Sequence, residues 1–404
     1  MKRVAVALAA LLAVATGALV ALNRLDESTP PELAAPGDPA RGAYVARIGH
    51  CEGCHTARGG APYAGGHAVP TPFGAVFAPN LTPDASGLGG WRAQDLWRAL
   101  HNGRSADGRL LAPACPYPNY SFVSARDVSD LFAYLQGLAP VAQPNRPHEL
   151  AFPYGTQPAL AVWRALYFRP GTPPADRGEA LVAGLGHCSA CHGRRNAWGA
   201  TGGALDLGGG EIPMQGWIAP ALDDPAEGGV AGWPLADVQA LLVGGQARGA
   251  GMSGPMARVV AHSTQYLAPA DAEAIAHFLQ RLPVRTRERR PAPPPPPEQA
   301  ALGARVYERH CASCHGKDGE GHEPMAPALA GNRAVVLARP DNVLRMVLGG
   351  GFGPATAAHP RPFGMPPFAT LLSDDEVAAV VSHLRSSWGH RASAVQAVDV
   401  NRRR

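Results

Sequence analysis

Apolar side chains form one long uninterrupted run at the start of the chain. After Lys2 and Arg3, residues 4–22 carry no charged side chain. As a helix rising about 1.5 Å per residue, this run spans about 28 Å, which is enough to cross the apolar part of a bilayer. A basic start before an apolar stretch also fits a cleaved secretory signal, with Ala-Val-Ala at 13–15 as an early cleavage site. Either reading exports the remainder of the chain, and we favour a retained anchor within residues 1–24.

Further along the chain, apolar residues recur at helical spacing in three segments of similar length. Each segment starts with Ser or Pro, carries acidic residues in its first turn, and then repeats apolar residues every three or four positions. The three predicted helices are residues 124–135, 269–279 and 373–384. We expect each of them to close a repeated unit and to pack across the first helix of that unit.

Each unit opens with a short helical stretch that has a glycine near its start, which is Gly42, Gly178 or Gly303. This stretch runs into the sequence His-Cys-x-x-Cys-His, and the tetrapeptide Ala-Pro-x-Leu follows later in each unit. Self-similarity at a long period indicates tandem domains. The repeats predict domains at residues 37–140, 176–283 and 298–388, with a linker at 284–297 and a basic tail at 389–404.

Six of the seven cysteines lie in these motifs, and Cys-x-x-Cys-His is the attachment sequence of c-type haem. Two thiols on one helical turn can each bond a vinyl group of the same porphyrin, and the following histidine then lies beneath the iron. We therefore predict three covalently bound haems. Their attachment residues are Cys51 and Cys54, Cys188 and Cys191, and Cys311 and Cys314, and their proximal iron ligands are His55, His192 and His315.

A Cys-x-x-Cys pair has two other common uses, as a redox disulfide and as half of a zinc site. Three copies, each with histidine directly after the second cysteine, disfavour both uses. No repeat contains a second cysteine pair that would complete a four-thiolate zinc site. With so few cysteines we also expect no structural disulfides.

The order of helix, haem motif, proline loop, sixth ligand and closing helix resembles the class I cytochrome c fold, used three times. The predicted fold is therefore all-α and loop-rich, with three tandem class I cytochrome c domains after an N-terminal apolar helix. Pro79, Pro220 and Pro327 recur in the Ala-Pro-x-Leu tetrapeptides. We expect their carbonyls to accept a hydrogen bond from the haem histidine, which would orient the ring and raise its basicity. A plain turn is the alternative role for any one of them.

The chain has only seven methionines, so the sixth iron ligand can be sought by elimination. In the third repeat we choose Met365, which lies in Gly-Met-Pro-Pro-Phe just before the closing helix. In the second repeat we choose Met256, in Gly-Pro-Met-Ala, over its nearest rival Met252. The methionines not chosen are expected to be packing residues: Met214, Met252, Met325 and Met346.

Repeat one contains no methionine, and the equivalent position holds the seventh cysteine, Cys115, in Pro-Ala-Cys-Pro-Tyr. Its flanking proline and aromatic residue match the surroundings of Met365, so Cys115 is our candidate for the sixth ligand of the first haem. His67, His101 and an open or water-bound iron remain as alternatives. A thiolate donates charge and stabilises ferric iron, whereas methionine raises the haem potential. The first haem is then expected to have the lowest potential of the three.

Composition adds two points. With 48 glycines, 41 prolines and only 6% aromatic residues, the chain alone would bury a thin apolar core, and haem would supply the missing apolar centre. The formal net charge is only +4, so nothing indicates a nucleic-acid partner.

A basic cluster beside the proline run 293–297 is interpreted as a solvated linker: Arg285, Arg287, Arg289 and Arg290.

Longer stretches around the motifs carry a family resemblance over nearly the whole chain. Residues 72–84, 87–91 and 101–103 resemble the first domain of the triheme cytochrome c subunits of bacterial membrane-bound dehydrogenases. Gly-Pro-Met at 254–256, His-Ser-Thr-Gln at 262–265 and the ending Leu-Arg-Ser-Ser-Trp-Gly at 384–389 are similar to its second and third domains. The departure is Cys115, where the pyrroloquinoline quinone alcohol dehydrogenase branch is expected to carry methionine.

The resemblance implies a role in respiration. Such a subunit accepts electrons from a catalytic dehydrogenase subunit, which is a quinoprotein, flavoprotein or molybdenum enzyme, and passes them to ubiquinone or a terminal oxidase. The catalytic partners oxidise alcohols, sugars, sugar acids or aldehydes. The implied location is the periplasmic face of the bacterial inner membrane, and the substrate site is expected in the partner rather than in this chain.

Two other functions stay open. A haem enzyme of thiosulfate dehydrogenase type would use a Cys-ligated haem as its reaction site, with Arg104 and Arg109 near Cys115 to bind an anion. The second alternative function is that of a free-standing electron carrier that moves between other complexes. A retained anchor would count against this alternative. The chain shows no nucleotide-binding glycine loop, nucleophile motif or clustered carboxylates, so the sequence favours an electron relay over a catalyst.

Overall fold

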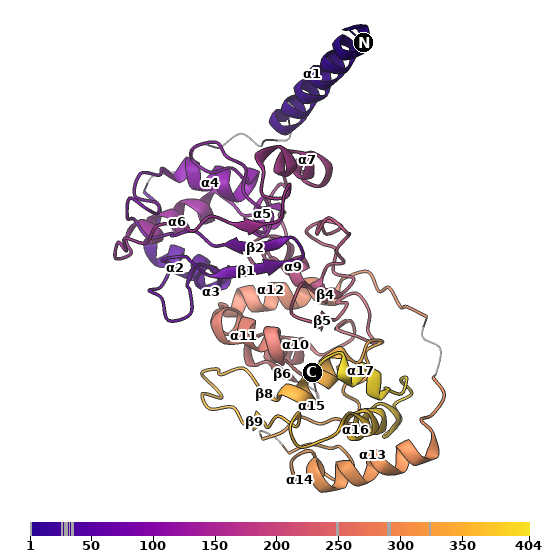
Figure 1. The fold of residues 1–404 in the computed structure, drawn as a ribbon. Coiled ribbons are helices and arrows are strands. Elements are labelled where there is room, and N and C mark those ends of the chain that lie inside the picture. The colour runs from indigo at the N-terminus through magenta and orange to yellow at the C-terminus, as the bar shows by residue number, and fades with distance from the viewer. Residues whose placement is uncertain are drawn as a thin grey trace. The chain divides into compact units, whose positions relative to one another are not determined.

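The computed structural model describes the chain apart from residues 1, 26, 28–30, 32, 34–35, 248–249, 289–291 and 323–324. Helices and loops make up most of it, and all strands are short. The chain folds into two compact units, one of residues 1–190 with 195–206 and one of residues 191–194 with 207–404 (Figure 1). The three predicted domain borders therefore remain a prediction.

The first unit begins with helix α1 (Lys2–Leu25), which is long and apolar enough to cross a membrane. None of its apolar span is buried inside the protein. The other helices of this unit are α2 (Pro39–Ile48), α3 (Cys51–His55), α4 (Ala93–Asn102), α5 (Tyr117–Tyr120), α6 (Ala125–Gln136), α7 (Gln157–Tyr167), α8 (Arg177–Ala180) and the short π-helix η1 (Leu181–Leu185).

The predicted closing helix of repeat one is present as α6, which Ser124 caps by accepting a hydrogen bond from the Asp127 N–H at 3.1 Å. As predicted, it packs across α2 (Figure 1). Gly42 allows the close crossing, because a Cβ at that position would lie 1.9 Å from the backbone oxygen of Asp130. Arg41 of α2 forms ion pairs with Asp127 and Asp130 of α6 and adds charge to this contact.

The first unit also contains a small antiparallel sheet that the sequence analysis did not predict. Strands β1 (Ala68–Thr71) and β2 (Gly74–Phe77) form a hairpin, and β3 (Glu149–Leu150) pairs with β2. Strand β2 leads directly into Ala78-Pro79. The hairpin therefore fixes the position of the proline carbonyl that was predicted to accept from His55.

Helix α9 (Ser189–His192) carries the second motif, and the second unit includes its last two residues. Its remaining helices are α10 (Leu235–Gly244), α11 (Gly254–His262), the 3-10 turn η2 (Thr264–Tyr266), α12 (Pro269–Gln280), α13 (Pro297–His310), α14 (Ala312–His315), α15 (Asp341–Gly349), α16 (Asp374–Ser386) and α17 (Ala397–Asn401). Its strand pairs are β4 (Gly210–Ile212) with β5 (Trp217–Ala219), β6 (Gln246–Ala247) with β7 (Ala250–Gly251), and β8 (Gly351–Phe352) with β9 (Gly364–Met365).

The two predicted closing helices of this unit are α12 and α16, and each begins within one residue of its predicted start. Helix α16 has a full capping box, in which Ser373 and Glu376 bond each other's backbone N–H. It packs across α13 (Figure 1), and a Cβ at Gly303 would lie 2.2 Å from the backbone oxygen of Ala379. Helix α12 packs against α10. The apolar core of the third repeat lies between α13, α15 and α16.

Two basic segments are more ordered than their composition suggests. Arg287, half-buried in the predicted linker, pairs with Asp223 and Asp224 and donates to the Gly208 carbonyl at 2.9 Å. The prediction of a solvated cluster is therefore wrong for Arg287, while Arg289 and Arg290 lie outside the described residues. The basic tail folds as α17, and its Arg403 pairs with the buried Asp341 at 2.9 Å.

Candidate haem sites

Each of the three motif histidines makes the same hydrogen bond. The Nδ1 atoms of His55 and His192 lie 2.8 Å from the carbonyl oxygens of Pro79 and Pro220, and that of His315 lies 3.0 Å from the oxygen of Pro327. The predicted role of the three prolines is confirmed. Because a carbonyl can only accept, Nδ1 carries the ring proton, and Nε2 is left as the basic nitrogen that an iron requires.

The loops that supply these carbonyls differ in length but end alike. The carbonyl lies 24 residues beyond the histidine in repeat one, 28 in repeat two and 12 in repeat three. In the first two repeats a hairpin fills the extra length, and its second strand, β2 or β5, ends next to the proline. The third repeat uses a shorter loop that holds one isolated bridge, between His322 and Ala326.

Burial keeps the three histidines neutral. It lowers the pKa of His55, His192 and His315, and the proline carbonyls oppose this effect only in part. A neutral imidazole is the form that binds a metal, since protonation would block Nε2. The motif residues therefore fit the ligand role predicted for them.

The cysteines fit attachment better than their alternative uses. None of the seven, all of which lie in the described part of the chain, forms a disulfide. Burial raises the pKa of Cys51 to about 12 and that of Cys311 to about 11, so both are neutral thiols at pH 7. Across the described residues, no group of three or more Cys, His, Asp or Glu side chains is arranged to hold a metal ion.

Cys115 lies beside the first attachment pair. Burial, and then the nearby Cys54, raises its pKa to about 12, and Cys115 in turn raises the pKa of Cys51. The thiol is half-buried, in the turn just before α5. The seventh cysteine thus lies near the first attachment pair, and its role as an iron ligand stays a prediction.

The two histidine rivals of Cys115 are less well placed. His101 is buried, with Nε2 2.8 Å from the Val123 carbonyl and Nδ1 3.2 Å from the Trp97 carbonyl, and its ring stacks on Trp97 at 4.2 Å. Both of its ring nitrogens thus face backbone oxygens. His67 lies near His55 and lowers its pKa, so it stands on the side of the proximal histidine.

The two methionines predicted as sixth ligands lie on regular elements. Met256 is in the first turn of α11, and Met365 is in β9, opposite Gly351 of β8. Met365 packs against the same apolar core as Cys311 and Ala312, and its role as the sixth ligand stays a prediction. The prediction of packing roles is wrong for Met214, which is 64% exposed, and for Met325, which is also exposed.

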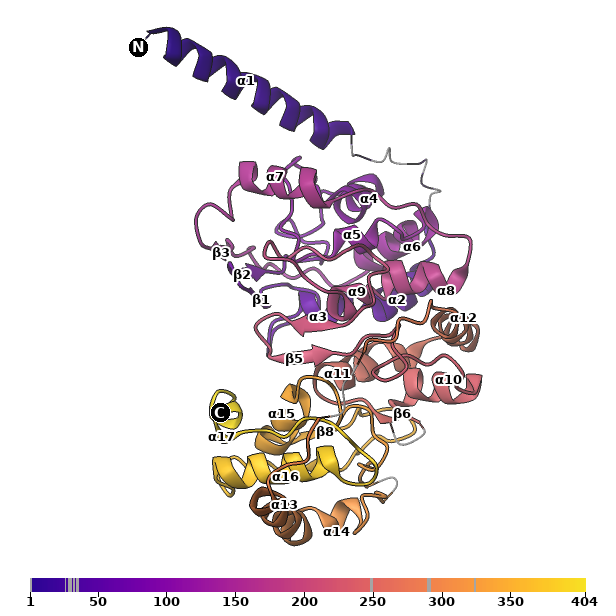
Figure 2. The same cartoon turned by 90° about the vertical axis from the view of Figure 1, so that its right-hand side faces the viewer.

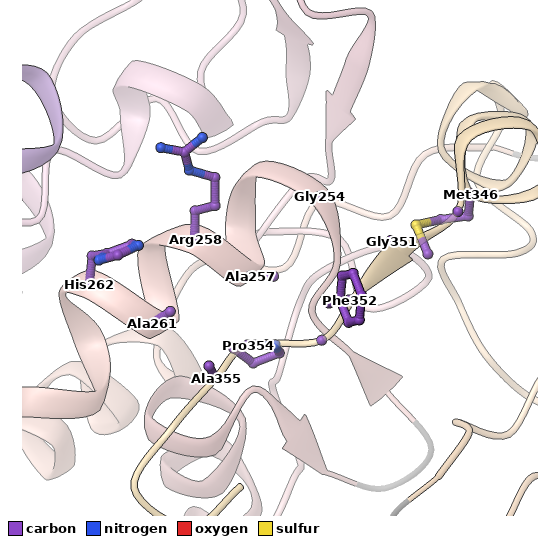
Figure 3. Close-up of a pocket in the computed structure, with 12 residues that line it drawn as sticks. Gly254, Ala257, Arg258, Ala261, His262, Met346, Gly351, Phe352, Pro354 and Ala355 are labelled. Atoms are coloured by element: carbon purple, nitrogen blue, oxygen red, sulfur yellow. The ribbon is translucent and has the colours of Figure 1, made fainter. Parts of the chain in front are cut away.

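A cavity of about 280 Å³ lies between α11, which carries Met256, and the chain around β8, the strand that pairs with β9. Its walls are α11, with Ala257, Arg258 and His262, and the chain around β8, with Phe352 (Figure 3). Met346 borders it beside Gly351 (Figure 3). The cavity brings the loops of the second and third candidate sites against one another within one unit.

Sequence reasoning missed a contact between the first and second sites, which α5 makes. Asn119 donates 2.9 Å hydrogen bonds to the Ser189 hydroxyl, inside the second motif, and to the Ala183 carbonyl. The ring of Tyr120 stacks against His187, with centroids 5.7 Å apart, and Nδ1 of His187 is buried without a hydrogen-bond partner.

Tyr120 also faces the first site. Burial, together with the nearby Cys51, Cys115 and Cys54, raises its pKa well above the ordinary value. A Cβ at Gly49, two residues before Cys51, would lie 3.6 Å from Cδ2 of Leu185. The segment after Cys115 therefore contacts the second attachment motif and lies near the first. In the sequence, the only sign of these contacts was the histidine that precedes the first cysteine of each motif.

The arginines suggested for an anion site are paired within the protein. Arg104 pairs with Glu27, and Arg109 pairs with Asp107 at 2.6 Å. Neither arrangement leaves the two guanidinium groups facing a common anion. The thiosulfate alternative therefore gains nothing from them.

Comparison with known proteins agrees with these sites. Residues 300–388 match the cytochrome c family model. The loop-rich helical fold and the Cys-x-x-Cys-His sites thus define a c-type cytochrome, which implies covalently bound haem.

Curated relatives match nearly the whole chain. The cytochrome c subunit of the quinone alcohol dehydrogenase of Gluconobacter oxydans is 36% identical over 90% of this chain and 81% of its own. The gluconate 2-dehydrogenase cytochrome c subunit of Pantoea cypripedii is 36% identical over 89% and 88%. The fructose dehydrogenase cytochrome subunit of Gluconobacter japonicus is 30% identical over 94% and 85%. The chain belongs to the family of cytochrome c subunits of dehydrogenase complexes, and its function is electron transfer.

Proposed function

We propose that the protein carries electrons through three covalently bound haems, from a catalytic dehydrogenase subunit to ubiquinone or a terminal oxidase. The observation that carries this proposal is the threefold hydrogen bond from a motif histidine to a proline carbonyl. A residue pattern that only happened to resemble a haem motif would not reproduce the same acceptor in loops of three different lengths. The residues at 37–140, 176–283 and 298–388 would each form a domain around one haem.

In this proposal the haems are attached through the six motif cysteines, with His55, His192 and His315 as proximal ligands. Cys115, Met256 and Met365 are the sixth ligands. Haem supplies the one-electron redox chemistry, and the chain positions each iron and sets its potential. The position of Cys115 beside Cys54 supports its role, and a thiolate there would make the first haem the one with the lowest potential.

Contacts of α5 with both motifs support direct electron exchange between the first and second haems. The cavity between α11, which carries Met256, and the chain around β8, which pairs with the strand of Met365, supports a similar proximity of the second and third. The partner would be a quinoprotein, flavoprotein or molybdenum dehydrogenase, as the relatives are named after alcohol, gluconate and fructose dehydrogenases. The reported relatives give no support to a thiosulfate dehydrogenase.

The location proposed is the periplasmic face of the inner membrane, with α1 retained as the anchor. The end of α1 is part of the folded unit, since Asn23 is buried and donates to the Ala161 carbonyl at 3.0 Å. The backbone oxygen of Asn23 accepts a hydrogen bond from Arg164 at 2.6 Å. A signal sequence makes no such contacts after export.

The number of haems is tested by mass and by a pyridine haemochrome assay on the purified chain. We expect three haems in the native protein and two in each of the double variants Cys51→Ala/Cys54→Ala, Cys188→Ala/Cys191→Ala and Cys311→Ala/Cys314→Ala. A native protein with one or two haems would overturn the proposal. Purification from its own host should also retain a dehydrogenase subunit whose oxidation of substrate reduces the haems.

The second-site ligand is tested by a matched pair of variants. Met256→Leu should remove the methionine-to-iron absorption of one haem and lower its potential, because a good axial donor to ferrous iron is lost. Met252→Leu should leave spectrum and potential unchanged. The reverse result would transfer the assignment to Met252.

A further inference from the structure

The outward face of α7 is apolar from Pro158 to Leu166. Its exposed side chains after Gln157 are Pro158, Val162 and Leu166, which lie four residues apart and therefore on one stripe. Val162 is 45% exposed and Leu166 is 61% exposed. A surface helix of a soluble protein normally turns charged residues outward and apolar residues inward. Helix α7 exposes an apolar stripe instead.

The single charged residue of α7 points into the protein. Arg164 is 1% exposed and donates to the carbonyl oxygens of Asn23 and Asn102. Asn23 itself lies in the last turns of α1 and donates to Ala161 of α7. Helix α7 therefore lies against the C-terminal end of α1, as Figure 2 shows. The chain after α1 is also tied to this unit through the Glu27–Arg104 ion pair.

Aromatic side chains surround α7. Trp163 donates its Nε1–H to the Trp198 carbonyl at 2.9 Å, and its ring lies 5.7 Å from that of Tyr167. Tyr154 lies 6.5 Å from Trp198. Phe152, just before α7, is 89% exposed. Trp and Tyr concentrate where a protein crosses the boundary between lipid tails and water.

These observations favour a lipid bilayer as the partner of this face. If α1 spans the membrane, its last turn lies at the membrane surface, and the contacts of Asn23 and Arg164 hold α7 at the same level. Arg24, at the end of α1, and Arg169, just after α7, are both exposed. At that level their charges would meet lipid headgroups.

We propose that the Pro158, Val162 and Leu166 face of α7 lies in the headgroup region of the bilayer that α1 spans. The protein is then held to the membrane by a spanning helix and by an interfacial helix that meet at Arg164. This inference rests on the retained anchor of the proposed function. Two attachments fix the first unit in one orientation above the membrane, which a single helix followed by a flexible segment does not.

The test uses the full haem-loaded chain in lipid nanodiscs, labelled with a small fluorophore at one introduced cysteine. Three variants are compared: Val162→Cys on α7, Leu12→Cys within α1, and Arg126→Cys, which is exposed on α6. Each is measured in phosphatidylcholine with and without bromine on the acyl chains. The haems quench the fluorophore equally in both lipids. The ratio of its emission in the two lipids therefore reports contact between the label and the acyl chains. The reaction of the fluorophore with the chain's own cysteines is measured on the native chain, which has no introduced cysteine.

We expect the Val162→Cys emission to fall about twofold in brominated lipid, because interfacial helices lie roughly 5–10 Å into the headgroup and acyl boundary. Bromine near the headgroup should quench this label most, and bromine near the bilayer centre should quench Leu12→Cys most. Arg126→Cys should not respond. Adding Leu166→Asp to Val162→Cys should reduce the quenching while the haem spectrum stays native.

Each other outcome has a distinct meaning. Quenching at Leu12→Cys without quenching at Val162→Cys would keep the anchor and overturn the interfacial helix. No quenching at either label would reject the anchor itself. If Val162→Cys is shielded only after a catalytic dehydrogenase subunit is added, the face belongs to that subunit and the inference is wrong.

Discussion

Cys115 is the residue that most distinguishes the first site from the other two. In the absence of iron its thiol is neutral, because burial raises its pKa to about 12. Binding to ferric iron would have to displace that proton, so the metal rather than the protein environment would make the thiolate. A buried thiol with this pKa is inert toward most oxidants until it binds metal.

Replacing Cys115 by methionine should convert the first site to the ligand set of the other two. We expect the thiolate-type electron paramagnetic resonance signal to disappear. The lowest haem potential should rise by on the order of 100 mV, within the roughly 0.8 V range that axial ligands set. Redox titration with parallel spectroscopy measures both changes. An unchanged spectrum and potential would exclude Cys115 as a ligand.

Asp341 is the buried charge on which the ordered tail depends. Burial alone would raise its pKa, but hydrogen bonds from Arg339 and Arg403 outweigh this and hold the pKa below the ordinary value. Its contribution to stability is therefore present above the unfolded-state pKa and is lost as pH falls through the lower folded-state pKa.

Asp341→Asn should destabilise the second unit at pH 7 by about 1.5–3 kcal/mol, the usual value of hydrogen bonds to a charged group. The difference from the native chain should shrink below about pH 4, where the unfolded carboxyl takes up its proton. Urea unfolding at both pH values, followed by circular dichroism, measures this. A difference that persists or grows in acid would contradict the assignment.

At the scale of elements, the paired helices α2 with α6 and α13 with α16 depend on two glycines. Gly303→Ala should force α13 away from α16, because the added Cβ meets the backbone oxygen of Ala379, which cannot move aside as a side chain can. We expect a loss of about 1–3 kcal/mol, typical of overpacking. Gly349→Ala is the control, since nothing lies within 4 Å of its Cβ position. Equal melting temperatures of the two variants would refute the close crossing.

Helix α5 is the element that joins the first two sites. Asn119→Ala should leave the Ser189 hydroxyl and the Ala183 carbonyl without this donor, at a cost of about 1–3 kcal/mol. It should also slow electron exchange between the first and second haems, which pulse reduction followed by optical spectroscopy can time. Gln94→Ala, at an exposed position of α4 in the same unit, should not change that rate. An unaltered rate in Asn119→Ala would remove α5 from the electron path.

The sequence predicted the closing helices well and the strands not at all. Ser124 and Ser373 cap their helices, and a cap is a local signal that tertiary contacts rarely override. The strands are two to four residues long, and β4 and β9 contain glycine, so no alternating pattern was long enough to read. Asn119 was missed for another reason: its partners lie 64 and 70 residues away.

On the scale of the whole molecule, the proline acceptors of the motif histidines could be predicted because each repeat carries its own copy of them. Contacts between repeats occur once and leave no such repetition. The Arg287 cluster shows the same limit, since its acidic partners Asp223 and Asp224 stand more than 60 residues earlier. Self-similarity in a sequence therefore identifies the repeats, but it does not identify the contacts between them.

Contacts between the second and third repeats also involve a haem loop. Asn342 of α15 bonds both backbone groups of Ile218 in β5, each at 2.8 Å. Pro220, whose carbonyl accepts from His192, follows two residues later. Arg345 of the same helix donates to the Gly216 carbonyl at 2.7 Å.

Asn342→Ala should release β5 and weaken the hydrogen bond from His192 to Pro220. A less basic imidazole gives less charge to the iron, so the potential of the second haem should rise while the other two stay constant. Spectroelectrochemical titration resolves the three transitions. Asn401→Ala, on α17 of the same unit, should leave all three potentials unchanged, and an unshifted second potential in Asn342→Ala would contradict the coupling.

Through Asn342 and Arg345, α15 of the third repeat supports the strand of the second repeat that leads to Pro220. A substitution that shifts α15 would therefore move the acceptor of His192. The potential of the second haem would then respond to a residue that contacts neither that haem nor its histidine.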